Sequence, residues 1–196
     1  MILGITGGSG CGKTTLLDAV RQAGGMVFDC DRIYHGLLET DQTLLSAIEN
    51  RFPHTVENGI LQRKKLGELV FSDENALNDL NAITHAAVKS EVVRRLSSAP
   101  SLAAIDAIAL FESGLSELCD VTVAVTAPEE ARVARLMARD GISESYARSR
   151  IAAQHDAGWF REKCRCVLTN DGTKAQFAAK CLAFLQDFGI INLSEK

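Results

Sequence analysis

The sequence GGSGCGKT, at residues 7–14, decides the fold. The residues before it, 2–6, are mostly apolar and predict a short buried strand. Residues 13–23 follow with leucine, valine and alanine on one face, as in an amphipathic helix that ends at the glycine pair after it. The stretch matches G-x-x-x-x-G-K-[ST], a loop that holds nucleotide phosphates between a strand and a helix. We therefore predict a nucleotide-binding loop on an α/β fold.

Each residue type in this loop suits a polyphosphate. Glycine lets the backbone curl until successive N–H groups point inward, and the start of the following helix adds its positive dipole end. Lys13 is expected to reach the β- and γ-phosphates, and the Thr14 hydroxyl is expected to be a metal ligand for Mg²⁺. The residues expected to bind the nucleotide are Gly8, Ser9, Gly10, Cys11, Gly12, Lys13, Thr14 and Thr15. Cys11 is expected to be a plain small residue, although a thiol at a helix start can also be reactive.

Features outside the loop narrow the class of nucleotide-binding protein. The chain has no N-K-x-D motif, which argues against a guanine-specific switch, and no second glycine signature of a transporter ATPase. With 196 residues it is also short for a ring-forming motor. A small-molecule kinase fits best, because phosphoryl transfer needs a substrate-covering insertion and a basic lid that exclude water.

Apolar segments alternate with amphipathic ones along most of the chain, which predicts a five-stranded parallel sheet flanked by helices. After residues 2–6, the expected strands are residues 26–29, 102–110, 121–126 and 165–169. Helices are expected from Pro128 to about residue 139 and from about Thr173 onward. Residues 31–98 show helical periodicity and no convincing strand, so we predict a helical insertion beside the sheet.

The whole chain, 1–196, is expected to be a single P-loop kinase domain with three parts. The parts are a core (about 1–30, 99–131 and 164–196), a helical substrate-binding insertion (about 31–98) and a lid (about 132–163). Residues 132–165 hold eight basic and four acidic side chains, although the net charge of the chain is −4. This basic stretch lies where a lid would close on phosphates.

Composition excludes several classes of protein. A hydrophobic fraction of 46%, with 15 glycines and 3 prolines, argues against a disordered or collagen-like chain. No apolar run approaches the roughly 20 residues of a membrane helix, and the net charge of −4 argues against a generally basic nucleic-acid binder. The six cysteines form no C-x-x-C pair and the start of the chain lacks signal-peptide features, so we expect free thiols in a cytoplasmic protein.

Two carboxylates directly follow the second expected strand, in the sequence Asp29-Cys30-Asp31. Strand ends of an open α/β sheet face the ligand crevice, so both carboxylates should lie near the phosphates, where one can orient an acceptor hydroxyl. The alternatives are that Asp31 caps the following helix and that Asp29 is a turn residue. A further acidic group near Mg²⁺ is either Asp106, within the third expected strand, or Glu112, at its end.

Three arginines, Arg132, Arg135 and Arg139, lie on one face of a predicted helix. The guanidinium fork suits phosphate oxygens, so this face is a candidate lid surface. The alternative is a solvated face whose arginines pair with the neighbouring acidic residues Glu129, Glu130 and Asp140.

From residue 4 to about residue 172, the chain resembles the dephospho-CoA kinase family. Besides the loop, the segments that carry the resemblance are DCDRI (29–33), NGILQRKKLG (58–67), VF (70–71), LNAITH (80–85), LFE (110–112), RLMARD (135–140), RIAAQ (150–154) and NDGT (170–173). The loop is shared by many families, whereas these segments in this order are much more specific.

The resemblance implies ATP- and Mg²⁺-dependent phosphorylation of the ribose 3′-hydroxyl of dephospho-coenzyme A, giving coenzyme A and ADP. It also implies a nucleoside-monophosphate-kinase-like core, a helical substrate domain and a lid. The family's catalytic carboxylate falls on Asp31 and its phosphate-binding lid arginine on Arg139, which would act with Lys13. Arg63 and His85 fall on motif positions of the substrate domain and are expected, with Asp31, to bind the acceptor.

The chain departs from the family pattern at a few places. Ala86 stands where proline is usual, Gln62 where aspartate is usual and Arg132 where the lid has glutamine, and residues 106–110 lack the usual proline. None of these changes lies within the loop or at Asp31.

Two other hypotheses stay open at this point: a P-loop kinase for a nucleoside, a nucleotide or another small alcohol, and a nucleotide-binding regulator without transfer activity. The expected partner is a small-molecule substrate, with no nucleic acid and no membrane. The oligomeric state is left open, with a slight preference for a monomer.

Overall fold

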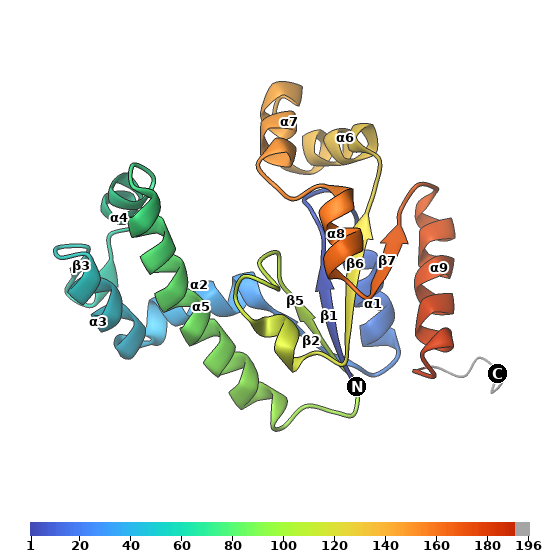
Figure 1. Cartoon of the computed structure of the whole chain (residues 1–196), viewed down its shortest axis with the longest axis horizontal. Helices are drawn as coiled ribbons and strands as arrows, with labels where there is room; N and C mark the ends of the chain where they lie inside the picture. The colour runs from blue at the N-terminus through green and yellow to red at the C-terminus, as the bar shows by residue number, and fades with distance from the viewer. Residues whose placement is uncertain (191–196) are drawn as a thin grey trace.

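Five strands form one parallel sheet in the computed structural model, which describes residues 1–190 (Figure 1). The strands are β1 (Ile2–Thr6), β2 (Met26–Asp29), β5 (Ala103–Asp106), β6 (Val121–Thr126) and β7 (Cys166–Thr169). Their order across the sheet is β2-β5-β1-β6-β7, and every neighbouring pair is parallel. The predicted α/β sheet is confirmed, and the loop after β1 leaves it at the centre.

β5 is shorter than the strand predicted over residues 102–110. The Ala107 N–H donates to the Ile5 carbonyl, and the chain then leaves the sheet in a series of turns. Ala107 and Leu110 are nevertheless buried, because these turns pack back on the core near Leu115. The strand predicted over residues 102–110 is therefore too long, because burial in a turn leaves the same sequence pattern as burial in a sheet.

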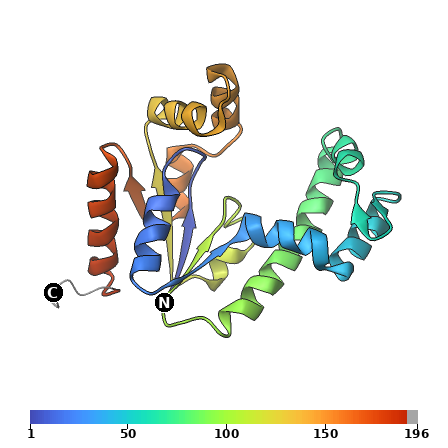
Figure 2. The same ribbon diagram turned by 180° about the vertical axis from the view of Figure 1, so that it is seen from behind.

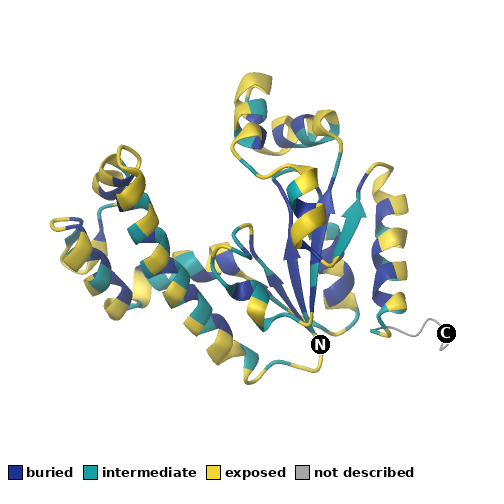
Figure 3. Ribbon diagram, in the orientation of Figure 1, coloured by how far each residue is buried: buried dark blue, intermediate teal, exposed yellow. Residues whose placement is uncertain are grey.

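Helices cover both faces of the sheet. α1 (Lys13–Gln22) and α9 (Lys174–Asp187) lie together on one face, as Figures 1 and 2 show from opposite sides. Leu16 of α1 packs with Phe177 and Leu185 of α9 in one buried cluster. α5 (Glu74–Leu96), η1 (Leu115–Leu118) and α8 (Ala157–Lys163) lie on the other face. The inner strands are consequently buried along most of their length (Figure 3).

The segment between β2 and β5 forms the predicted helical insertion. Its helices are α2 (Cys30–Thr40), α3 (Gln42–Arg51), α4 (Arg63–Val70) and α5. Residues from all four helices build a separate apolar core, including Leu38, Leu45, Leu66 and Leu80. The insertion extends away from the sheet on the β2 side (Figure 1).

The insertion also contains a small hairpin, which corrects the prediction that it holds no strand. β3 (Val56–Glu57) and β4 (Ile60–Leu61) are antiparallel. Asn58 and Gly59 between them both have positive φ, 52° and 75°, as a tight two-residue turn requires. Each strand spans only two residues, too few to show an alternating pattern. The Asn-Gly pair is the only local sequence signal for this hairpin.

α6 (Glu129–Asp140) and α7 (Glu144–Ala152) form a small helical pair beyond the carboxyl ends of β1 and β6 (Figure 1). Val133, Leu136, Ala147 and Ile151 hold the two helices together in a core of their own. α8 then returns to the sheet, where Phe160 packs against Ala124 of β6.

Two predictions about the whole chain are tested by residues 1–190. All six cysteines are free thiols, as expected. Among the described helices, none is both long enough and apolar enough to cross a bilayer.

Candidate functional site

The loop after β1 curls around a cleft at the carboxyl edge of the sheet. Gly7, Gly10 and Gly12 have φ of 135°, 76° and 98°, a region that side chains disfavour. A Cβ on Gly7 would lie only 2.2 Å from the Val125 carbonyl oxygen, so glycine is required there on two grounds. The cleft has a volume of about 970 Å³ and is lined by every loop residue from Gly8 to Thr14.

Lys13 and Thr14, the last two residues of the loop, both line the cleft. Lys13 begins α1, and its Nζ donates to the Gly7 carbonyl at 2.8 Å, which holds the ammonium across the mouth of the loop. Thr14 is exposed and lines the cleft, whereas Thr15 does not line it. The cleft therefore offers a cation, a hydroxyl and the start of a helix to an anionic ligand.

Three carboxylates face the loop across the cleft. Asp29 ends β2 and is paired in register with Asp106 of β5, while Asp31 lies in the first turn of α2. The Asp29 side chain accepts from the Arg32 N–H at 2.9 Å, so Asp29 is the N-cap of α2. This corrects both alternatives: Asp29 is more than a turn residue, and Asp31 is not the cap. Within residues 1–190, the Asp31 carboxylate has no hydrogen-bond or ion-pair partner.

Asp106, rather than Glu112, lies in the cleft. Burial raises the pKa of Asp106 to about 6, against the attraction of Lys13 and with the repulsion of Asp29 and Asp31. Glu112 Oε1 instead contacts His155 Nε2 at 2.8 Å, and Glu112 lines a neighbouring cavity of about 440 Å³. Of the two candidates for an acidic group near Mg²⁺, the geometry favours Asp106.

Two arginines of α6 contact the loop backbone directly. Arg132 Nε donates to the Ser9 carbonyl at 2.9 Å, and Arg135 Nη1 donates to the Gly10 carbonyl at 3.1 Å. Arg139 lines the cleft but pairs with its neighbour Asp140 at 2.7 Å. Among these three arginines, Arg139 alone pairs with an acidic neighbour, as the solvated-face alternative expected, although it also lines the cleft.

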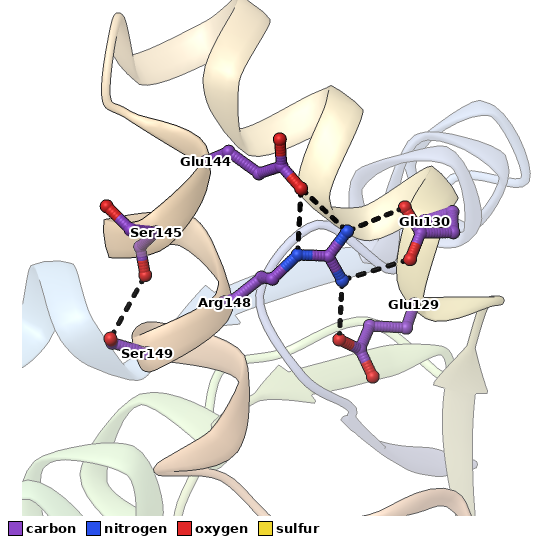
Figure 4. Close-up of polar contacts among 6 residues, drawn as sticks. All are labelled: Glu129, Glu130, Glu144, Ser145, Arg148 and Ser149. Atoms are coloured by element: carbon purple, nitrogen blue, oxygen red, sulfur yellow. Dashed lines mark hydrogen bonds and ion pairs between the residues drawn. The ribbon is translucent and has the colours of Figure 1, made fainter.

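Arg148 of α7 is paired entirely with carboxylates of its own helical pair. It forms ion pairs with Glu129, Glu130 and Glu144 at 2.8 to 3.0 Å, on the surface of the helical pair (Figure 4). It does not line the cleft, in contrast to Arg150 at the end of α7.

Two amide side chains that the sequence argument did not single out also hold the loop. Gln154 Oε1 accepts from the Ser9 N–H at 2.8 Å, and Gln154 Nε2 donates to the Ser9 hydroxyl at 2.9 Å. Asn170, just after β7, donates from Nδ2 to the Cys11 carbonyl at 2.9 Å. Gln154 ends the segment RIAAQ and Asn170 begins the segment NDGT, and both segments carry the family resemblance. That resemblance is the sequence signal that points to these two residues.

The two expected acceptor-binding residues differ in position. His85 of α5 lines a pocket of about 200 Å³ next to Asp31, together with Tyr34 and Asn81. Burial lowers the pKa of His85, which favours its neutral form. Arg63 begins α4 in the insertion and lines neither this pocket nor the cleft.

Cys11 is buried in the loop, with 1% of its surface exposed. Burial raises the pKa of its thiol, against the attraction of Lys13. A protonated, inaccessible sulfur is a poor nucleophile, so the geometry favours a packing role over a reactive one.

Comparisons with known proteins agree with one another. The model of a family described as dephospho-CoA kinase matches residues 1–176. A curated dephospho-CoA kinase from Latilactobacillus sakei is 32% identical over 189 residues, which cover 94% of each chain. A crystal structure from Thermus thermophilus is 34% identical with a TM-score of 0.79, over 95% of this chain and 97% of that one. Dephospho-CoA kinase from Campylobacter jejuni, 24% identical, shares the fold with a TM-score of 0.69 over 95% and 96% of the two chains.

Proposed function

Since the chain belongs to the dephospho-CoA kinase family, we propose that its cleft performs that family's reaction with Asp31 as the catalytic carboxylate. The protein is a kinase that uses ATP and Mg²⁺ to phosphorylate the ribose 3′-hydroxyl of dephospho-coenzyme A, giving coenzyme A and ADP. We propose the role that each residue of this chain has in the reaction.

The observation that supports the proposal is the free carboxylate of Asp31 between two cavities. Asp31 lines both the cleft of the P-loop and the smaller pocket that holds His85. Asp29 caps α2, which leaves the Asp31 carboxylate open to a ligand. Asp31 accepts the proton of the ribose hydroxyl as the hydroxyl oxygen attacks the γ-phosphorus of ATP, and the bond from that phosphorus to the β–γ bridging oxygen breaks.

The phosphate side is provided by the loop and the lid. Lys13 and Arg139 supply positive charge to the transferring phosphoryl group, and the N–H groups of the loop bind its oxygens. The donor set suits Mg²⁺, because the Thr14 hydroxyl and the half-buried Asp106 carboxylate both line the cleft and oxygen is the ligand this ion prefers. When bound, Mg²⁺ neutralises charge on the phosphate oxygens.

The acceptor side is provided by the smaller pocket and the insertion. His85 and Tyr34 present polar groups next to Asp31, where the acceptor's ribose would lie. Arg63 stays an acceptor contact on the strength of its motif position alone. We also propose that the protein is cytoplasmic, monomeric and does not bind nucleic acid. Light scattering of the purified protein tests the oligomeric state.

Replacing Asp31 by asparagine tests the assignment. Asp31→Asn keeps the shape but cannot accept a proton, so kcat should fall about 100-fold or more while ATP affinity stays within about twofold. Asp41→Asn is the matched control, because Asp41 caps α3 away from the cleft and asparagine also caps helices. ADP release with dephospho-coenzyme A is the assay, and unchanged turnover in Asp31→Asn would remove Asp31 from the mechanism.

A further inference from the structure

Two residues from the lid side bind every polar group of Ser9, at the tip of the loop. Arg132 Nε donates to the Ser9 carbonyl at 2.9 Å. Gln154 takes the other two groups, accepting from the Ser9 N–H at 2.8 Å and donating to the Ser9 hydroxyl at 2.9 Å. Arg132 Nη2 also donates to Gln154 Oε1 at 2.9 Å, so the two side chains support each other.

The hold on the Ser9 carbonyl determines the direction of the next N–H. In a trans peptide the C=O and the following N–H point in opposite directions, and no peptide bond in residues 1–190 is cis. Arg132 does not line the cleft, whereas Gly10 does. The Ser9 carbonyl therefore points out toward Arg132, and the Gly10 N–H points in toward the cleft. Within residues 1–190 this N–H donates to no protein acceptor, which leaves it for a phosphate oxygen.

Other carbonyls of the loop are held in the same way. Arg135 holds the Gly10 carbonyl and Asn170 holds the Cys11 carbonyl, each from outside the loop. Arg135 differs from Arg132 because it also lines the cleft and can itself meet a ligand. A change at Arg132 therefore removes support from the loop without removing a ligand contact.

We propose that Arg132 is a positioning residue for phosphoryl transfer, which orients the Ser9–Gly10 peptide so that the Gly10 N–H binds the terminal phosphates of ATP. The proposal rests on the ATP site described above. The Arg132 guanidinium reaches the Ser9 carbonyl through Nε and the Gln154 side chain through Nη2, two separate nitrogens of one planar group. Arg132 is half-buried against the loop, so its donors are partly sheltered from water. A charged hydrogen bond is stronger in such a sheltered place than in water.

The experiment separates positioning from simple support of the fold. Arg132→Ala should raise the calorimetric Kd for ATP about tenfold, as expected for a lost charged hydrogen bond. The KM for dephospho-coenzyme A should stay within about twofold, because no acceptor contact changes. Arg132→Gln restores an amide donor toward the Ser9 carbonyl and should weaken ATP less than alanine does. Arg148→Ala is the matched control and should leave ATP affinity unchanged, because Arg148 pairs with glutamates (Figure 4) and does not line the cleft.

Several results would overturn the inference. The first is an Arg132→Ala protein that folds and binds ATP as tightly as the wild type. The second is an equal loss of affinity for ATP and for the acceptor, which a general loosening of the fold would give. If Arg132→Ala does not fold, Arg132→Met keeps the length of the side chain without any donor, and unchanged ATP affinity there would be equally decisive. Calorimetry needs no turnover, so an inactive but ATP-binding wild type contradicts only the proposed acceptor, whereas a wild type that binds no ATP contradicts the site itself.

Discussion

Asp106 should make the stability of the metal-free protein fall as the pH rises through about 6. Burial is the main reason that its pKa is raised from 3.8 to about 6. Between these values the folded protein keeps a proton that the unfolded chain releases. The contribution of Asp106 to the free energy of unfolding is therefore complete below about pH 4 and is lost as the pH rises through about 6.

The size of the effect follows from the two pKa values. Each pH unit between them is worth about 1.4 kcal/mol, so ionising Asp106 in the fold costs up to about 3 kcal/mol. Asp106→Asn keeps the shape of the side chain and cannot ionise. Near pH 4 we expect the variant and the wild type to have similar unfolding free energies. At pH 8 the variant should be more stable by up to about 3 kcal/mol.

Urea unfolding from pH 4 to pH 8, in EDTA and without nucleotide, measures this difference. Comparing variant with wild type at each pH cancels the titration of groups that both proteins share. Asp41→Asn, the same chemical change outside the cleft, shows what the amide itself does. The reasoning would be refuted by a difference between Asp106→Asn and wild type that is the same at both ends of the pH range, or that favours the wild type at pH 8.

Three further predictions concern the loop and the core. Gly7→Ala should lower the free energy of unfolding in urea by roughly 3 kcal/mol or more, because the new Cβ would clash with the Val125 carbonyl. Gly24→Ala is the control: Gly24 also has positive φ but lies in open space, so this change should lower the free energy of unfolding by about 1 kcal/mol. Phe177→Ala should cost about 3–5 kcal/mol, because Phe177 is 1% exposed between α9 and α1, while the KM for ATP stays at the wild-type value. Iodoacetamide should modify Cys11 far faster in urea than in the folded protein, as measured by mass spectrometry of its peptide; equal rates would contradict a buried thiol.

The sequence carried much of the fold because the relevant signals are local. A buried strand, the glycine loop and the helix after it are contiguous, and their bounds in the structure, Ile2–Thr6 and Lys13–Gln22, agree with the prediction to within a residue. The signal was weakest where local patterns are ambiguous. The strands of the β3–β4 hairpin are too short to show the alternation of apolar and polar residues that identifies a strand. The apolar run after Asp106 is buried in turns rather than in the sheet.

By itself, the sequence determined the family, the phosphate loop and the aspartate that follows β2, because these depend on residue types at short, regular spacing. Only the tertiary structure showed that Asp106 lines the cleft while Glu112 does not, and that Arg132 and Gln154 hold Ser9. Arg132 lies 123 positions from Ser9 along the chain, and Gln154 lies 145 positions from it. Such contacts depend on how helices pack against the sheet, and that packing is a property of the whole fold, which no local spacing encodes.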